Sequence, residues 1–285
     1  MKNFKNKKIK LNDENIENQR LNRDFFQRYS TIELALNLLG TVICRRFDDT
    51  ICRGLIVETE AYLGVEDEAS YSFGGRRTES NEPMFMEPGT CFVRLIYGMY
   101  FCFNLSSNDY GGAILIRAIE PVEGIDKMIE MRTNHPKAPR TNKFLQQQHL
   151  IANGPSKFCI AFAINEQLNK LDITKSEDIW IESNASSKSI DIKNDVIESK
   201  RIGINSKNPW ANKLLRFYLK DNKSIQIVKK EYWLLSQLLA QSSLCSFETF
   251  SKYNNFSFGS GMIVSDPGFQ FAGHTSPNLS VYWNA

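Results

Sequence analysis

The chain has 285 residues, of which 42% are hydrophobic and 24% charged, and its formal net charge is +3. That length is enough for one large or two small domains with a real hydrophobic core, and the composition is typical of a globular protein. No apolar run approaches the ~20 residues of a membrane-spanning helix, so no membrane association is expected. The six cysteines lack C-x-x-C spacing and the three histidines are dispersed, which argues against a zinc site.

Charge is placed unevenly along the chain. Residues 1–23 contain seven Lys or Arg and three Asp or Glu, a net charge of +4, so the remaining residues sum to −1. We predict a disordered basic tail over residues 1–20. It is interpreted either as an arm that adds salt-sensitive attraction to nucleic acid or as a solvated tail without that role.

The first ordered elements are a helix and a β-hairpin. A capping box at Ser30-Thr-Ile-Glu33 predicts a helix that ends at Gly40. Two strands follow, over 41–47 and 51–62, and are expected to pair as a hairpin. Alternation along the second strand predicts a core face that consists of Leu55, Val57, Thr59 and Ala61. The opposite face carries Ile56, Glu58, Glu60 and Tyr62, and is expected to direct its two carboxylates and phenol towards water or a cleft.

A long Gly-, Pro- and Ser-rich loop at 64–89 precedes a second hairpin. Its strands are predicted at 90–96 and 99–105, around a tip at Tyr97-Gly98. A buried strand at 113–119 would place Leu115 and Arg117 on the same face. Further predictions are helices at 123–132 and 155–164, and strands at 179–182, 201–204 and 215–219.

The character of the chain changes after residue 222. Residues 231–241 are predicted to form a short amphipathic helix, and few charged residues follow position 242. Residues 223–285 are interpreted as a docked extension, an aggregation-prone tail or a partner-binding segment.

Residues 21–220 closely resemble the alkyladenine (3-methyladenine) DNA glycosylases of the animal type. The matching stretches occur in family order and are Gly54-Leu-Ile-Val-Glu-Thr-Glu-Ala-Tyr-Leu-Gly64, Met84-Phe-Met86, Pro88-Gly-Thr90, Tyr97-Gly-Met-Tyr-Phe-Cys102, Asn104, Arg117-Ala118, Gly154-Pro-Ser-Lys157 and Leu215-Arg-Phe-Tyr218. The resemblance implies an α+β fold, a single mixed domain at 21–222 around a curved antiparallel β-sheet with a few helices and a protruding β-hairpin.

The resemblance also implies a monofunctional enzyme that flips damaged purines out of duplex DNA and hydrolyses the N-glycosidic bond. Glu60 matches the residue that activates water, and Arg117 matches the residue that helps to hold this water and to orient Glu60. The alternative is a structural ion pair of Arg117 with Glu58 or Glu60, and this is compatible with a role of Arg117 in holding the water. Neither a metal nor another cofactor is implied.

The base pocket and the DNA contacts are implied in the same way. Tyr62 matches an aromatic wall of the pocket, Asn104 matches the residue that obstructs the amino group of guanine, and Leu115 packs beside it. Tyr97 matches the residue that fills the gap left by the flipped base, with Met99 against the neighbouring pair.

Several positions depart from the family pattern. Tyr71 stands where the family has histidine, and Arg94 stands where the animal enzymes have a second stacking tyrosine. Because a guanidinium repels a cationic alkylpurine, we predict a weaker preference for charged lesions and a better one for neutral lesions such as hypoxanthine or ethenoadenine. In the phosphate-contacting loop at Thr78, an arginine is replaced by Ser80, and Arg76 with its neighbour Arg77 is expected to compensate.

The leading hypothesis is therefore an active glycosylase for alkylated or deaminated purines in double-stranded DNA. The alternatives are a catalytically weakened protein that binds damaged DNA and, third, a protein-interaction module. The family suggests a monomer located in the nucleus, and a mitochondrial pool is left open; residues 5–10 (KNKKIK) form a weak import signal.

Overall fold

The computed structural model describes residues 19–136, 143–184 and 190–225, all within one unit of the chain, Met1–Gln226. The helix predicted at 231–241, and nearly all of the predicted amino-terminal tail and carboxy-terminal extension, lie outside these residues. The helices are α2 (Arg23–Arg28), α3 (Thr31–Asn37), α4 (Ile125–Asn134), α5 (Pro155–Ala161) and α6 (Ile192–Asp195). The strands are β1 (Val42–Phe47), β2 (Thr50–Tyr62), β3 (Cys91–Ile96), β4 (Tyr100–Ser106), β5 (Ala113–Glu123), β6 (Ile179–Glu182), β7 (Val196–Ser199) and β8 (Arg216–Leu219).

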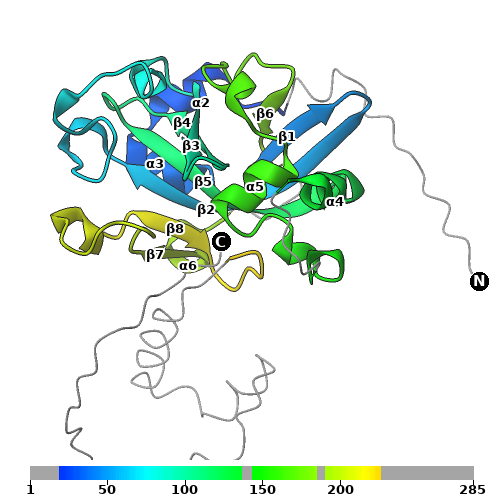
Figure 1. Cartoon of the computed structure of the whole chain (residues 1–285). Helices are drawn as coiled ribbons and strands as arrows, with labels where there is room; N and C mark the ends of the chain where they lie inside the picture. Colours follow the sequence, from blue (N-terminus) through cyan, green and yellow to red (C-terminus); the bar gives the residue numbers. More distant parts are fainter. Residues whose placement is uncertain (1–18, 137–142, 185–189, 226–285) are drawn as a thin grey trace, which may run out of the picture. The chain divides into compact units, whose positions relative to one another are not determined.

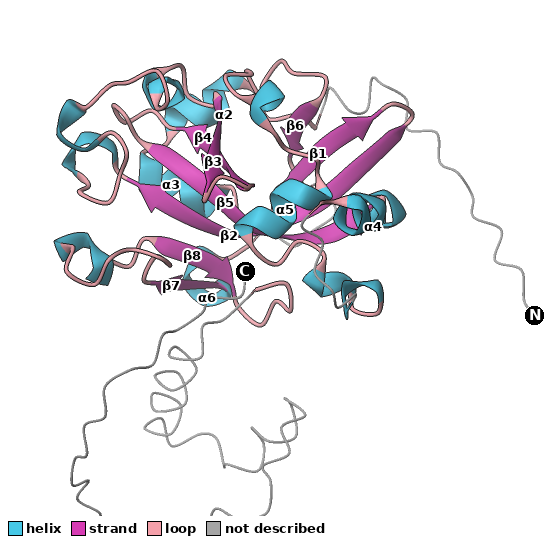
Figure 2. Ribbon diagram, in the orientation of Figure 1, coloured by secondary structure: helices cyan, strands magenta, loops and turns pink. Residues whose placement is uncertain are grey.

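These strands form one antiparallel sheet around β2 (Figure 1). The order is β3-β4-β5-β2-β1-β6, and β8 pairs with both β2 and β7. The long segment between β2 and β3 is a loop with three short 3₁₀ turns (Figure 2). The predicted α+β class is thus confirmed, with few helices, a curled antiparallel sheet and the β3–β4 hairpin at its edge.

Local signals place the first elements as predicted. Ser30 caps α3, because its side chain accepts from the amide of Glu33 and the Glu33 carboxylate accepts from the amide of Ser30. The β1–β2 hairpin turns at Asp48-Asp49, where Asp48 has a φ of 44°. Aspartate is among the few side chains that tolerate this left-handed conformation.

The sheet has a core face and a site face. The hydroxyl of Thr59 donates to the carbonyl of Ala35 in α3 (2.9 Å), and Phe103 of β4 packs edge-on against Phe158 of α5. Because Thr59 pairs with Ile116 across β5, these residues share the face on which the hydrophobic core lies. Residues of the opposite register, Glu60 among them, therefore point to the other face.

The central strand β2 changes its neighbour midway, and this shapes the site. Its first half pairs with β1, whereas Glu58, Thr59 and Glu60 pair with β8. The pairing with β5 shifts register on both sides of Glu58, as it does at a β-bulge. Strands β8 and β5 flank the carboxylates of Glu58 and Glu60, and both residues are buried. Of the two expected surroundings, water or a cleft, water is therefore excluded.

Other predicted elements also need correction. The helix predicted to end at Gly40 ends at Asn37. The helix predicted at 123–132 begins only after Gly124, whose φ of 72° interrupts the chain at the end of β5. The helix predicted at 155–164 ends at Ala161. The strand predicted at 201–204 is absent from this described segment, because the side chain of Arg201 turns inward to Asp67 and the amide of Ile202 donates to Glu60 instead of to a strand.

Candidate active site

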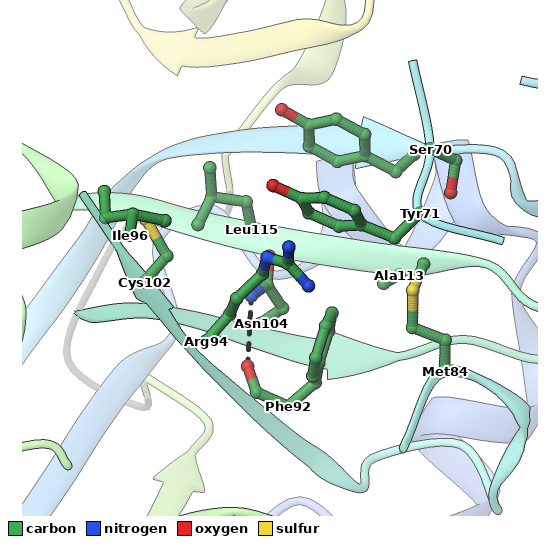
Figure 3. Close-up of a pocket in the computed structure, with 11 residues that line it drawn as sticks. Ser70, Tyr71, Met84, Phe92, Arg94, Ile96, Cys102, Asn104, Ala113 and Leu115 are labelled. Atoms are coloured by element: carbon green, nitrogen blue, oxygen red, sulfur yellow. Dashed lines mark hydrogen bonds between the residues drawn. The ribbon is translucent and has the colours of Figure 1, made fainter. Parts of the chain in front are cut away.

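A cavity of about 90 Å³ lies on the site face of the sheet, beneath the loop that follows β2. It is lined by all five residues predicted for the base pocket, namely Tyr62, Tyr71, Arg94, Asn104 and Leu115. Four come from the adjacent strands β3, β4, β5 and β2. Tyr71 comes from the loop and is labelled in Figure 3. The fold thus brings together side chains that lie up to 53 positions apart in the sequence.

The cavity has further walls that the sequence reasoning missed. Phe92, Arg94 and Ile96 are every second residue of β3, and Cys102 and Asn104 are two positions apart in β4, so all share one face of the hairpin. The period-two spacing of these residues in the two predicted strands could have identified them as neighbours of Arg94 and Asn104. The amide of Asn104 donates to the carbonyl of Phe92 (3.0 Å), which fixes the plane of its side chain against the cavity (Figure 3).

Beside the cavity, the carboxylate of Glu60 is fully buried, with 0% of its side chain exposed. The hydroxyl of Tyr62 donates to Oε2 (2.9 Å) and the amide of Ile202 donates to Oε1 (2.8 Å). A guanidinium nitrogen of Arg117 lies 3.0 Å from the same Oε1. Tyr62 therefore joins the carboxylate to the cavity, because its ring forms part of the wall and its hydroxyl contacts Glu60.

Arg117 lies between two carboxylates, so the structural and the functional interpretations of this residue share one geometry. Its Nε donates to Glu58 (3.0 Å), while its other contact is to Glu60. Burial acts to lower the pKa of Arg117, but the carboxylates of Glu60 and Glu58 outweigh it and raise that pKa. Arg117 is thus a permanent cation that cannot leave one carboxylate without also disturbing the other.

Arg216 completes this cluster and was not assigned a role from the sequence. It is fully buried, donates to Oε1 of Glu58 (2.8 Å) and donates through Nε to the carbonyl of Lys200 (3.0 Å). Glu60 and Arg216 are directly paired residues of β2 and β8. With two carboxylates and two guanidinium groups, the cluster is formally neutral, which is the condition under which charges are tolerated in an interior.

A second buried ion pair lies next to Tyr62. Arg201 donates to Oδ1 of Asp67 (2.9 Å) and to the carbonyl of Ala61 (3.0 Å), and its guanidinium carbon lies 4.5 Å from the centre of the Tyr62 ring. Burial, followed by the negative charge of Glu60, raises the pKa of Tyr62 well above its ordinary value. The phenol therefore stays protonated and keeps its hydrogen bond to Glu60 at neutral pH.

The charges of the cluster act on the cavity wall. Burial raises the pKa of the Cys102 thiol to about 11, with smaller opposing effects of Arg117 and Glu60. A carboxylate offers about four lone-pair positions, of which the three contacts described use three. One position on Oε2 of Glu60 is therefore left without a contact among those described.

The hairpin beyond the cavity carries the predicted wedge. Tyr97 stands at its tip with 88% of its surface exposed, and Met99 next to it is also exposed. Positive φ angles at Tyr97 (51°) and Gly98 (67°) make the tight turn. The Tyr97 side chain is exposed and does not pack in the hydrophobic core, so its ring is available to an external partner.

The loop with the predicted backbone contacts is held by Asn81. Its amide donates to the carbonyl of Arg76 (2.8 Å), and its Oδ1 accepts from the hydroxyl of Thr78 (3.0 Å). Arg76 is exposed, and its contact with a phosphate stays a prediction. Arg77, in contrast, forms a two-pronged ion pair with Glu82, so its charge is already partly neutralised.

Among the described residues, no helix has the length and apolar character to cross a membrane. Within the same ranges, no three His, Cys, Asp or Glu side chains gather as a metal-binding group. The expectation that no cofactor is needed stays a prediction.

Comparison with known proteins gives matches over most of the chain. The family model described as methylpurine-DNA glycosylase matches residues 24–223. A probable DNA-3-methyladenine glycosylase of Encephalitozoon cuniculi is 43% identical over 199 residues, which are 70% of this chain and 89% of that protein. The human DNA-3-methyladenine glycosylase is 42% identical over 212 residues, 74% of this chain and 69% of its own length. A putative 3-methyladenine DNA glycosylase of Clostridium perfringens (strain 13 / Type A) is 41% identical over 210 residues, 72% and 98% of the two chains.

With these matches, the fold and the site define a hydrolase that cleaves N-glycosyl bonds. Because the family model covers most of the chain, and relatives from a microsporidian, an animal and a bacterium agree, the chain belongs to the methylpurine-DNA glycosylase family. The resemblance seen in the sequence motifs is thereby confirmed.

Proposed function

We propose that this protein is a monofunctional DNA glycosylase that rotates alkylated or deaminated purines out of duplex DNA and hydrolyses their N-glycosidic bond, the first step of base excision repair. The observation that carries the proposal is the Glu60 carboxylate, buried and held by Arg117, Tyr62 and the amide of Ile202 beside a ring-lined cavity. Such a carboxylate is positioned before substrate arrives, and it can take a proton from water while it stabilises the positive sugar that forms as the bond breaks.

The cavity and the hairpin support the binding step. A base inside a duplex is out of reach, so it must leave the stack, at a cost of a few kcal/mol that is smaller for damaged bases. The exposed ring of Tyr97 suits the gap left behind, with Met99 against the next base pair. Tyr62 and Tyr71 offer ring faces to the flipped base, and the fixed amide of Asn104 opposes the amino group of normal guanine.

The test is single-turnover excision from duplexes that carry hypoxanthine, ethenoadenine or 7-methylguanine. We expect release by the wild type and a loss of ~100-fold or more in Glu60→Gln, the scale of general-base contributions. Glu66→Gln is the matched control, because it removes an exposed carboxylate six positions further along and should leave the rate unchanged. Equal rates for Glu60→Gln and the wild type would refute the assignment.

A second candidate is a catalytically weakened protein that binds damaged DNA. It is favoured by the position of Arg94, whose guanidinium carbon lies 3.5 Å from the centre of the Tyr71 ring and so occupies one of the faces on which a base would stack. The same assay separates the two functions. A binding protein would release no base, while both wild type and Glu60→Gln would bind the damaged duplexes tightly and selectively.

The proposed setting follows from the family and from the chain's charge. The partner is double-stranded DNA with damaged purines, bound by a monomer in the nucleus, with a mitochondrial pool as a further possibility. Fractionation of cells that express the full chain tests the location, and sedimentation of the free protein tests the oligomeric state.

A further inference from the structure

Arg94 is the one charged residue that lines the cavity, within the part of the chain that the structure describes. It extends from β3 on the same face as Phe92 and lies across the ring of Tyr71, with its guanidinium carbon 3.5 Å from the ring centre (Figure 3). This is the distance of a face-on cation–π stack. The flat guanidinium is therefore part of the surface that a flipped base would meet.

The charge of Arg94 is not neutralised nearby. No ion pair of Arg94 occurs among the described residues, and its Nε is buried without a hydrogen-bond acceptor in the same set. The buried carboxylates of Glu58 and Glu60 are already engaged by Arg117 and Arg216. The cavity wall thus carries the positive charge of Arg94, and one N–H of this guanidinium lacks an acceptor among the described residues.

These two properties select among purines. A base alkylated on a ring nitrogen carries a positive charge of its own, which the guanidinium repels at short range. A neutral base feels no such repulsion, and a carbonyl oxygen on its edge can accept from a guanidinium N–H. Stacking against the flat guanidinium is favourable for a neutral ring as well.

We propose that Arg94 sets the substrate class of this enzyme, so that neutral purines with a carbonyl acceptor, such as hypoxanthine, are preferred over cationic N-alkylated purines. The inference rests on the proposed glycosylase function and refines it. Arg94 is here a specificity-determining residue, separate from the Glu60 cluster that performs the hydrolysis.

The experiment compares single-turnover excision of hypoxanthine and of 7-methylguanine from otherwise identical duplexes, each corrected for enzyme-free release. Because each protein is judged by the ratio of its two rates, the different intrinsic stabilities of the two glycosidic bonds cancel between variants. Arg94→Gln removes the charge and keeps a planar donor, whereas Arg94→Lys keeps the charge. Thermal melting of each variant confirms that it is folded.

We expect the hypoxanthine to 7-methylguanine ratio to fall at least tenfold in Arg94→Gln and to stay within about threefold of the wild type in Arg94→Lys. An unchanged ratio in folded Arg94→Gln overturns the inference, as does an equal fall in Arg94→Lys, which would assign selectivity to shape and not to charge. If excision is Glu60-dependent but the ratio does not move, only this inference fails. If no duplex loses its base, the proposed function fails and this inference fails with it.

Discussion

Substitution of Arg216 by methionine tests whether the buried cluster is organised as described. Arg216 is fully buried and lies 2.8 Å from Glu58. Its removal leaves two carboxylates with one guanidinium group, which is a net charge of −1 in the interior. At this distance and an effective dielectric constant of about 20, the direct attraction is ~6 kcal/mol. Part of it is offset by the desolvation of both ions, and breaking a buried pair typically costs about 3–5 kcal/mol.

We therefore expect Arg216→Met to lower the free energy of unfolding by about 3–5 kcal/mol. For a domain of this size, that corresponds to a fall in Tm of roughly 6–20 °C. Urea denaturation at neutral pH measures the first quantity and thermal melting the second. Arg28→Met is the matched control, because Arg28 is exposed on α2 and its loss should change stability by no more than about 0.5 kcal/mol.

A double variant separates charge balance from packing. Glu58→Gln together with Arg216→Met restores formal neutrality, and we expect it to recover at least about 1.5 kcal/mol of the loss. Excision by Arg216→Met, measured well below its Tm, should stay within about tenfold of the wild type, because all contacts of Glu60 remain. A loss of less than about 1 kcal/mol in the single variant, or no recovery in the double variant, would refute the neutral-cluster interpretation.

Three further changes test other parts of the site and its frame. Tyr62→Phe removes the hydrogen bond to Glu60 and keeps the ring, so urea denaturation should show a loss of about 1.5–3 kcal/mol; an unchanged midpoint would mean that the bond is absent in solution. Tyr97→Ala should leave the Tm unchanged and reduce single-turnover excision ~10-fold or more, whereas equal rates would argue against the wedge. Burial alone would raise the pKa of Asp172, but hydrogen bonds from Thr174 and the charge of Arg23 lower it. The contribution of the ionised Asp172 carboxylate to the free energy of unfolding is therefore fully present above the unfolded pKa of about 3.9, and it is lost as the pH falls through the lower folded pKa. The difference in the free energy of unfolding between wild type and Asp172→Asn should vanish only in strong acid.

The parts of the fold that the sequence predicted well are those with local causes. The capping box at Ser30 and Glu33 involves residues three positions apart, and the two hairpins are built from strands joined by short turns. The cavity residues were predicted from the family motifs. The order of these motifs along the chain identified the pocket positions, which residue spacing alone could not. Period-two alternation then explains why Arg94 and Asn104 meet on one face of β3 and β4.

The parts that could not be predicted depend on non-local pairing. Arg216 reaches Glu58 across 158 positions, and the amide of Ile202 reaches Glu60 across 142. Both contacts exist because β2 pairs with β1 in its first half and with β8 where its register shifts. A β-bulge cannot be recognised in an alternating sequence pattern. The segment at 201–204 has the composition of a strand, but the buried pair of Arg201 with Asp67 outweighs that propensity.

The same register shift explains how a fully buried carboxylate can be suited to hydrolysis. A charge inside a protein is tolerated only where its partners replace water, and Glu60 has a cation, a phenol and a backbone amide around it. Because Arg117 also holds Glu58, it is fixed from two sides and cannot follow a movement of Glu60. The carboxylate and its partners are therefore organised before any substrate binds.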